Sequence, residues 1–395
     1  QSIVSVLVDN IVQELDIETS DAFTRIEYDS EAYDLYLKSK SVYSLSDNYD
    51  DNLKAVELMK QAISKDNNLV MAQVFLGQMQ YDLGYYAEAS VIYEKALTRS
   101  KSLQDNAGVA ESLRKQGQLL RKNKDYETAL AKFGEALSIS TVMNDKSSMA
   151  KTYNSMAILN FKTDAKDDAL KNWLHALAIV EEFGDKPKIS KYLNNIGIWY
   201  WRDDDYSKSI EYYQKSLLIK RELGDVRNIA KTLNNLGEVY FAMGDYPNST
   251  TQFDESIKIK EKLQDNKGLN ATLYNRGETY FYSFEYKRAI DDFRRTIKMI
   301  DDEGSDHERY RYIGMSHFYL SNFDSCNFYL KKSDEYFSNH LTKRLSILPY
   351  LVISYMKTGD NTLSNTALKN FKDIISEHDP PKKDYIITNW AAYKA

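Results

Sequence analysis

A lysine followed three residues later by an asparagine recurs along this chain at intervals of 40 residues. The three pairs are Lys151 with Asn154, Lys191 with Asn194, and Lys231 with Asn234. Residues three apart share one face of a helix, so each pair places an ammonium group beside an amide. An asparagine side chain offers both a donor and an acceptor, which match one peptide unit of an extended chain. The pairs therefore predict a surface that binds a peptide backbone, with lysines that favour acidic side chains or a terminal carboxylate.

A row of aromatic residues follows the same 40-residue interval. The row comprises Tyr81, Phe161, Trp201, Phe241 and Phe281. Aromatic side chains are common apolar anchors in interfaces, so the row predicts the part of the surface that selects its ligand. Two other interpretations remain open from the sequence. The asparagines would then hydrogen-bond the next helix and fix the stacking, and the aromatics would fill space between helices.

The sequence contains no recognisable catalytic, metal-binding or cofactor-binding pattern. Its five histidines are scattered and lack the paired spacing of a zinc site. Neither GxxxxGK[ST] nor GxGxxG is present, so no loop is expected to cradle a phosphate. A GxSxG nucleophile turn is also missing. We therefore predict no catalytic residue, no metal ligand and no cofactor, and a chain that is not itself an enzyme.

Composition narrows the classes of partner. With 52 basic and 58 acidic residues the formal net charge is −6, which argues against a nucleic-acid partner. No segment approaches the roughly 18–20 apolar residues that span a bilayer, so direct membrane insertion is not expected. The single cysteine, Cys326, excludes an intramolecular disulfide and fits a reducing compartment. A cytoplasmic location is therefore predicted.

Internal repeats explain the regular spacing. A glycine or alanine recurs every 40 residues, and an aromatic residue follows each of them sixteen residues later. The small residues are Gly77, Gly117, Ala157, Gly197, Gly237 and Gly277, and the aromatics are Tyr93, Phe133, Trp173, Tyr213, Phe253 and Phe293. Within each period, apolar residues at helical spacing predict two amphipathic helices, and the small residue lets the two approach closely. Aspartates that recur in the turns, such as Asp225 and Asp265, are expected to cap helices.

These residues resemble the tetratricopeptide repeat (TPR). The consensus reads here as Leu236-Gly237, Tyr240, Gly244-Asp245-Tyr246, Ser249 and Phe253, with Pro247 in the first turn of the second helix. The resemblance implies an all-α fold, a right-handed superhelical solenoid of about nine helix pairs. It also implies a concave face lined by the first helix of each pair, on which the lysine and asparagine pairs would lie.

We expect two parts along the chain. Residues 1–30 would form a leading amphipathic helix, Ile3–Leu15, and a linker, and residues 31–395 one continuous array of repeats. A seam is expected near residues 300–308, and a last unit would begin at Trp390 and be cut short. Because the sequence starts at Gln1, we expect it to be a piece of a longer protein.

The stretch AYDLYLKS, residues 32–39, is similar to a junction in bacterial class III adenylate/guanylate cyclase-like signalling proteins of the TolB-like/TPR type. There the stretch reads AYDLYLKG, so Ser39 replaces a glycine. The resemblance implies a regulatory module that binds a protein or peptide, as an extended segment or a helix, in a bacterial signalling protein. The alternative is that the repeats mediate dimerisation of a cyclase-like enzyme whose catalytic domain lies upstream of residue 1.

Overall fold

The computed structural model describes residues 28–45, 49–299 and 306–377. Within these ranges every regular element is helical and no strand is present, so the predicted all-α class is confirmed. Eighteen α-helices follow one another in sequence as nine pairs, as predicted. The chain divides into two compact units, residues 1–199 and 200–395, with the boundary inside helix α10 (Lys186–Arg202). The expected leading helix Ile3–Leu15, most of the expected seam (300–305) and the end of the chain from residue 378 lie outside the described residues.

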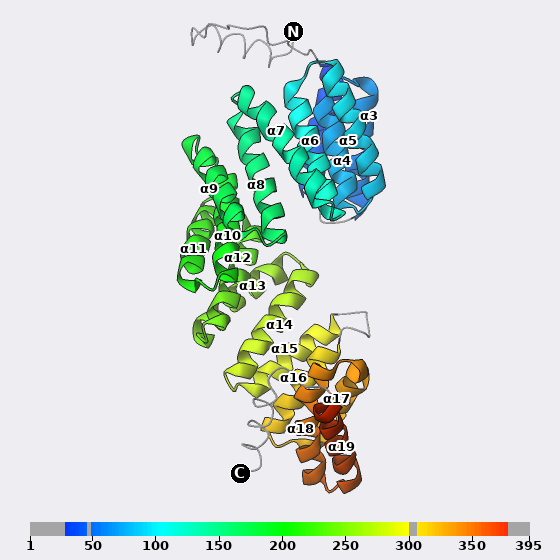
Figure 1. The fold of residues 1–395 in the computed structure, drawn as a ribbon, viewed down its shortest axis with the longest axis vertical. Helices are drawn as coiled ribbons and strands as arrows, with labels where there is room; N and C mark the ends of the chain where they lie inside the picture. Colours follow the sequence, from blue (N-terminus) through cyan, green and yellow to red (C-terminus); the bar gives the residue numbers. More distant parts are fainter. Residues whose placement is uncertain (1–27, 46–48, 300–305, 378–395) are drawn as a thin grey trace. The chain divides into compact units, whose positions relative to one another are not determined.

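Unit 1 is built of antiparallel helix pairs that are joined by short turns (Figure 1). Its helices before α10 are α2 (Ser30–Leu45), α3 (Tyr49–Lys65), α4 (Val70–Asp82), α5 (Tyr86–Ser102), α6 (Asn106–Lys122), α7 (Tyr126–Val142), α8 (Lys146–Lys162) and α9 (Lys166–Glu182). Each helix contacts the helix before it and the helix after it, and the first helices of neighbouring pairs also touch.

Unit 2 has the same plan with less regular pairs toward its end (Figure 1). Its helices are α11 (Tyr206–Glu222), α12 (Val226–Ala242), α13 (Tyr246–Lys262), α14 (Asn266–Tyr282), α15 (Tyr286–Lys298), α16 (His307–Tyr319), α17 (Phe323–Tyr336), the 3₁₀ turn η2 (Phe337–Asn339), α18 (Leu341–Thr358) and α19 (Asn361–Glu377).

The turns between helices are set by local chemistry. In the turn between α12 and α13, Gly244 takes a left-handed conformation with φ of 76°, which glycine adopts without steric penalty. The Asp245 carboxylate then accepts a hydrogen bond of 3.2 Å from the backbone N–H of Asn248 and caps α13. Pro247 lies in the first turn of that helix, as predicted. Asp225 and Asp265 cap α12 and α14 in the same way, which confirms the capping role expected for the recurrent aspartates.

The recurrent glycines allow close helix contact. A Cβ atom at Gly237 would lie 2.5 Å from Cε1 of Phe253, and one at Gly117 would lie 2.6 Å from Cε1 of Phe133. Both phenylalanines are fully buried. The aromatic residue of the second helix therefore lies directly over the glycine of the first, which is the close approach that the repeat pattern predicted.

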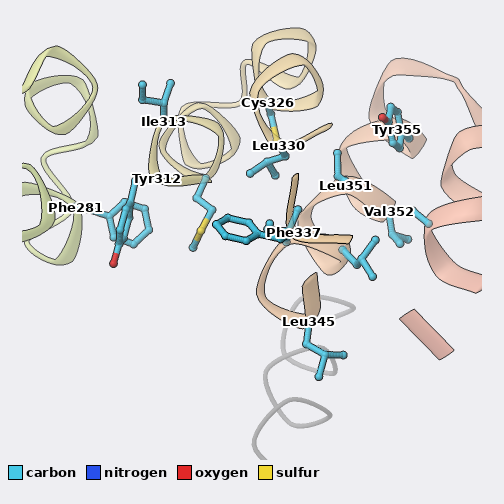
Figure 2. Packing of buried hydrophobic residues seen from close by; sticks show 14 of the residues in the cluster. Phe281, Tyr312, Ile313, Cys326, Leu330, Phe337, Leu345, Leu351, Val352 and Tyr355 are labelled. Atoms are coloured by element: carbon cyan, nitrogen blue, oxygen red, sulfur yellow. The ribbon is translucent and has the colours of Figure 1, made fainter. Parts of the chain in front are cut away.

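The end of unit 2 has a continuous apolar core contributed by α14 to α19 (Figure 2). Phe281, Tyr312, Leu330 and Phe337 all belong to this core, and each is at most 7% exposed. Cys326 is fully buried in it, and burial raises the pKa of its thiol to about 11. The cysteine is therefore a packed core residue.

Candidate functional site

The first helices of successive pairs form one surface in each unit, which we call the inner face. In unit 1, α6 contacts both α4 and α8, and in unit 2, α14 contacts both α12 and α16. The predicted site residues all lie on these first helices. They are Lys151, Asn154 and Phe161 on α8; Lys191, Asn194 and Trp201 on α10; Lys231, Asn234 and Phe241 on α12; and Phe281 on α14.

Asn154 is buried, with 6% of its surface exposed, and its side chain links three helices of unit 1. Its Oδ1 accepts hydrogen bonds of 3.2 Å from Trp173 Nε1 on α9 and 3.0 Å from Asn195 Nδ2 on α10. The carbonyl group is thus engaged within the stack of helices. Asn194, one turn of the stack later, is half-buried.

Cationic side chains gather on the inner face of unit 1 into what we call the basic cluster. It consists of Arg114 and Lys115 on α6, Lys151 on α8, and Lys188 and Lys191 on α10. The acidic side chains among them are Glu111 and Asp185, and Asp82 of α4 is near Lys115. Cations outnumber carboxylates in this part of the inner face, which favours an anionic ligand.

Glu111 and Arg114 form a buried ion pair at the edge of the basic cluster. Arg114 Nε donates a 3.0 Å hydrogen bond to Glu111 Oε2, and the two residues are 7% and 9% exposed. Burial pulls the pKa of Glu111 upward, but the charge and hydrogen bonds of Arg114 outweigh it and hold this pKa below its usual range. One repeat earlier, these residues occupy the register of Lys151 and Asn154, which is the sequence signal that could have identified Glu111.

Desolvation weakens the charge of two other members of the basic cluster. Burial, with the nearby Arg114 adding to it, lowers the pKa of Lys115 to about 8. Lys115 also donates a hydrogen bond to Gln78 of α4. Surrounding protein likewise lowers the pKa of Lys191, and the charges of Arg114 and Lys188 contribute. An anion bound here would relieve this repulsion and restore the ordinary pKa values.

In unit 2 the predicted asparagine is part of a polar chain that connects neighbouring pairs. Asn234 Nδ2 donates to Glu238 Oε1 at 2.7 Å, and its Oδ1 accepts from Thr272 Oγ1 of α14 at 2.8 Å. Asn275 of α14 donates a second 2.8 Å bond to the same Glu238 oxygen. Burial raises the pKa of Glu238, and the two amide donors partly offset this rise. Lys231 is exposed at the start of this row.

The aromatic row makes contacts within and between pairs. Phe161 meets Trp173 edge-on with ring centroids 5.5 Å apart, and Phe241 meets Tyr282 of the next pair at the same distance. Phe161, Trp201 and Phe241 are half-buried. Phe281, at 7% exposure, lies within the core, which is the space-filling role that the sequence left open as the alternative.

Comparison with known proteins decides the family. The sequence pattern of the tetratricopeptide repeat matches residues 68–141, 148–222 and 228–302, together more than half of the chain. The chain belongs to the tetratricopeptide-repeat family. The matching pattern describes a repeat and not a catalytic domain. Among curated proteins, none matches this TPR chain closely enough to count as a relative.

Several solved structures share the fold of this TPR protein. A STAND signal-transduction ATPase with a tetratricopeptide repeat sensor from Pyrococcus horikoshii has a TM-score of 0.70 at 15% identity over 96% of this chain. The present chain spans 56% of that protein. Apo RapI gives a TM-score of 0.62 at 14% identity, and a Rap protein complexed with competence and sporulation factor gives 0.50 at 13%. Each Rap comparison covers 88% of this chain and 98% of the other. At such identities the likeness shows the fold alone.

Among the described residues, no helix is long and apolar enough to cross a bilayer.

Proposed function

We propose that this TPR chain is a non-catalytic module that binds an acidic, extended protein segment on the inner face of unit 1. The basic cluster is the observation that carries the proposal. Lys151 and Lys191 stand one repeat apart on neighbouring first helices, and their charges act on groups two helices away. A carboxylate placed between them would interact with several cations at once in surroundings that are poor in water, where charge interactions are stronger than in bulk solvent.

The ligand contacts divide between recognition and framework. Lys151, Lys191 and Asn194 supply charge and amide groups to the ligand. Asn154 and Asn234 hold adjacent pairs in register through their hydrogen bonds to Asn195 and Thr272. Half-buried Phe161 supplies an apolar contact at the edge of the same surface in unit 1, and Trp201 and Phe241 do so in unit 2. Regular helix pairs from residue 31 onward are proposed to act as one array.

A role in signalling is part of the proposal. The Rap protein of the same fold was solved in complex with competence and sporulation factor, which supports a fold suited to binding such factors. The AYDLYLKS stretch lies in α2, where Ser39 is fully buried and donates a 2.6 Å hydrogen bond to the carbonyl of Ala55. This bond explains how serine fits where cyclase-like proteins have glycine. We propose a regulatory region of a larger bacterial signalling protein, cyclase-like in organisation, that works in the cytoplasm.

The test is binding of a fluorescent peptide rich in glutamate, followed by anisotropy. The double variant Lys151→Ala/Lys191→Ala should bind about tenfold more weakly, which corresponds to about 1.4 kcal/mol. The control Lys101→Ala/Lys171→Ala removes two exposed lysines from second helices and should bind like the parent. Raising the salt concentration should weaken the parent and bring it closer to the double variant. Equal affinity of the parent and both variants would refute the proposal.

Self-association remains the alternative function. It was inferred from the last residues, Trp390 to Ala395, which lie outside the described part of the chain. Sedimentation of the chain over a range of concentrations tests it, because a dimer that forms independently of any peptide would favour this alternative.

A further inference from the structure

A groove opens in unit 1 on the side away from the inner face, between second helices α3 and α5. It encloses about 920 Å³. Ile63, Leu76, Val91 and Ile92 give it an apolar floor and wall, and Lys95 and Arg99 stand along α5. Val91 is 56% exposed, which is unusual for a valine beside a hydrophobic floor. The groove thus has the composition of an interface, with apolar residues at its centre and charged residues at its rim.

The groove exists because the repeat is irregular at this point. Helix α4 begins at Val70, seven residues before Gly77, whereas α6 begins at Asn106, eleven residues before Gly117. The helical turn present at the start of α6 is therefore replaced, before α4, by an irregular connection. Asn67 of this connection lines the groove.

Two polar atoms at the groove are left without partners. Gln73 is 6% exposed and its amide nitrogen donates to Asn67, but its Oε1 is buried and has no hydrogen-bond partner among the described residues. Arg99 donates through its terminal nitrogen to Asn68, while its Nε is buried and likewise unpartnered there. A buried acceptor and a buried donor that lack partners each cost about 1–3 kcal/mol. Both atoms therefore point to a polar ligand group that is absent from the described residues.

The described chain begins at one end of this groove. The backbone N–H of Asp29 donates a 3.0 Å hydrogen bond to Asp66, the neighbour of Asn67. Tyr28 is close enough to Asp105 and Asp66 for their charges to raise its pKa, after the larger effect of burial. Asp105 follows Ser102, the last residue of α5, which also lines the groove. Residues 1–27 thus join the described chain beside Asn67 and Ser102.

We propose that the segment Ile3–Leu15 of this same chain binds in the groove between α3 and α5 as an amphipathic helix. At helical spacing its apolar residues Ile3, Leu7 and Ile11 share one face, which would cover Ile63, Val91 and Ile92. Its acidic residues Asp9 and Glu14 complement Lys95 and Arg99. The segment provides an apolar stripe and carboxylates where the groove provides an apolar floor and cations.

The dimensions agree with this occupant. A helix of thirteen residues is about 20 Å long, and α5 from Ser90 to Ser102 runs for about 18 Å along the groove. The twelve residues between Leu15 and Tyr28 can span up to about 40 Å when extended. The segment is covalently attached, so its effective concentration at the groove is in the millimolar range, and even weak contacts suffice to hold it there. By covering α3 and α5 it would cap the open end of the stack of helices.

Cysteine cross-linking in the full chain tests the proposal. The variant Leu7→Cys/Val91→Cys should form a disulfide within one chain under mild oxidation, seen as a shift of the monomer on a non-reducing gel. The control Leu7→Cys/Val142→Cys places the second thiol on α7 at a residue that is 86% exposed, and should form at most a tenth as much. Cys326 is fully buried and does not compete. Equal cross-linking in both variants, or cross-links between two chains only, would overturn the proposal.

Hydrogen exchange gives a second measurement that does not depend on the added thiols. In the parent chain the amides of residues 3–15 should exchange at least tenfold more slowly than in the variant Val91→Asp, which places a charge in the groove. Because Val91 is exposed, the variant should retain the helical circular dichroism of the parent. The control Val142→Asp should leave exchange of residues 3–15 unchanged. Identical exchange in the parent and in Val91→Asp would show that the segment lies elsewhere.

Discussion

Replacing Glu111 by glutamine should have opposite effects on the stability and on the ligand affinity of unit 1. The substitution keeps the shape of the side chain but removes its charge, and Arg114 is then buried without a counter-charge. Breaking a buried pair by removing one partner costs about 3–5 kcal/mol. Since glutamine still offers Arg114 an acceptor oxygen, we expect a loss near the lower end of this range, about 3 kcal/mol.

The same substitution makes the basic cluster more positive by one charge. Two unit charges about 8 Å apart interact by about 0.5 kcal/mol in bulk water and about 2 kcal/mol at a protein surface with an effective dielectric constant of 20. The affinity for a glutamate-rich peptide should therefore rise by a factor between about 2 and 30. A variant that is less stable but binds more tightly is the signature of a charge that serves the fold and opposes the ligand.

Urea unfolding and peptide anisotropy, measured on the same samples, test this reasoning. The double variant Glu111→Gln/Arg114→Met removes both charges and should recover most of the lost stability. Because the pKa of Glu111 is lowered in the folded state, its ionised form stabilises the fold above the unfolded value of 4.5. That contribution is lost as the pH falls, so the difference between parent and Glu111→Gln should shrink from pH 7 to pH 3. A single variant within 0.5 kcal/mol of the parent at pH 7, or one as unstable as the double variant, would refute the ion-pair argument.

Two further substitutions test the polar framework. Asn154→Ala removes the acceptor of Trp173 and Asn195 and should destabilise the chain by about 1–3 kcal/mol in urea unfolding, whereas Asn106→Ala, at an exposed position, should change little; equal effects would contradict the bridging role of Asn154. In unit 2, burial lowers the pKa of Lys260 to about 8, against the opposing charges of Asp265 and Glu238, so the folded protein binds fewer protons than the unfolded chain above that pH. Stability should then rise with pH between about 8 and 10, by up to about 1.4 kcal/mol per pH unit, and Lys260→Met should rise less steeply; parallel curves would contradict the pKa assignment.

The repeat pattern was sufficient to predict the helices and their turns. Positions such as Gly237 and Phe253, or Asp245 and Pro247, act through contacts within one helix pair, so their spacing along the chain already specifies the local structure. The all-α class, the nine pairs, the close approach at glycine and the capping aspartates all follow from such short-range rules. The packed environment of Cys326 was also predictable, because it occupies the small-residue position of its repeat.

The roles of polar and aromatic residues on the inner face depended on contacts between pairs. By sequence Asn154 and Asn194 are equivalent, yet the structure engages the carbonyl of Asn154 with Trp173 and Asn195. Phe241 and Phe281 share one register, but Phe281 is buried by Tyr312 and Tyr286, which belong to other helices. Helical periodicity fixes the direction in which a side chain leaves its helix. What the side chain meets there depends on the distance to the next helix and on the residues that this helix presents, and only the tertiary structure determines both.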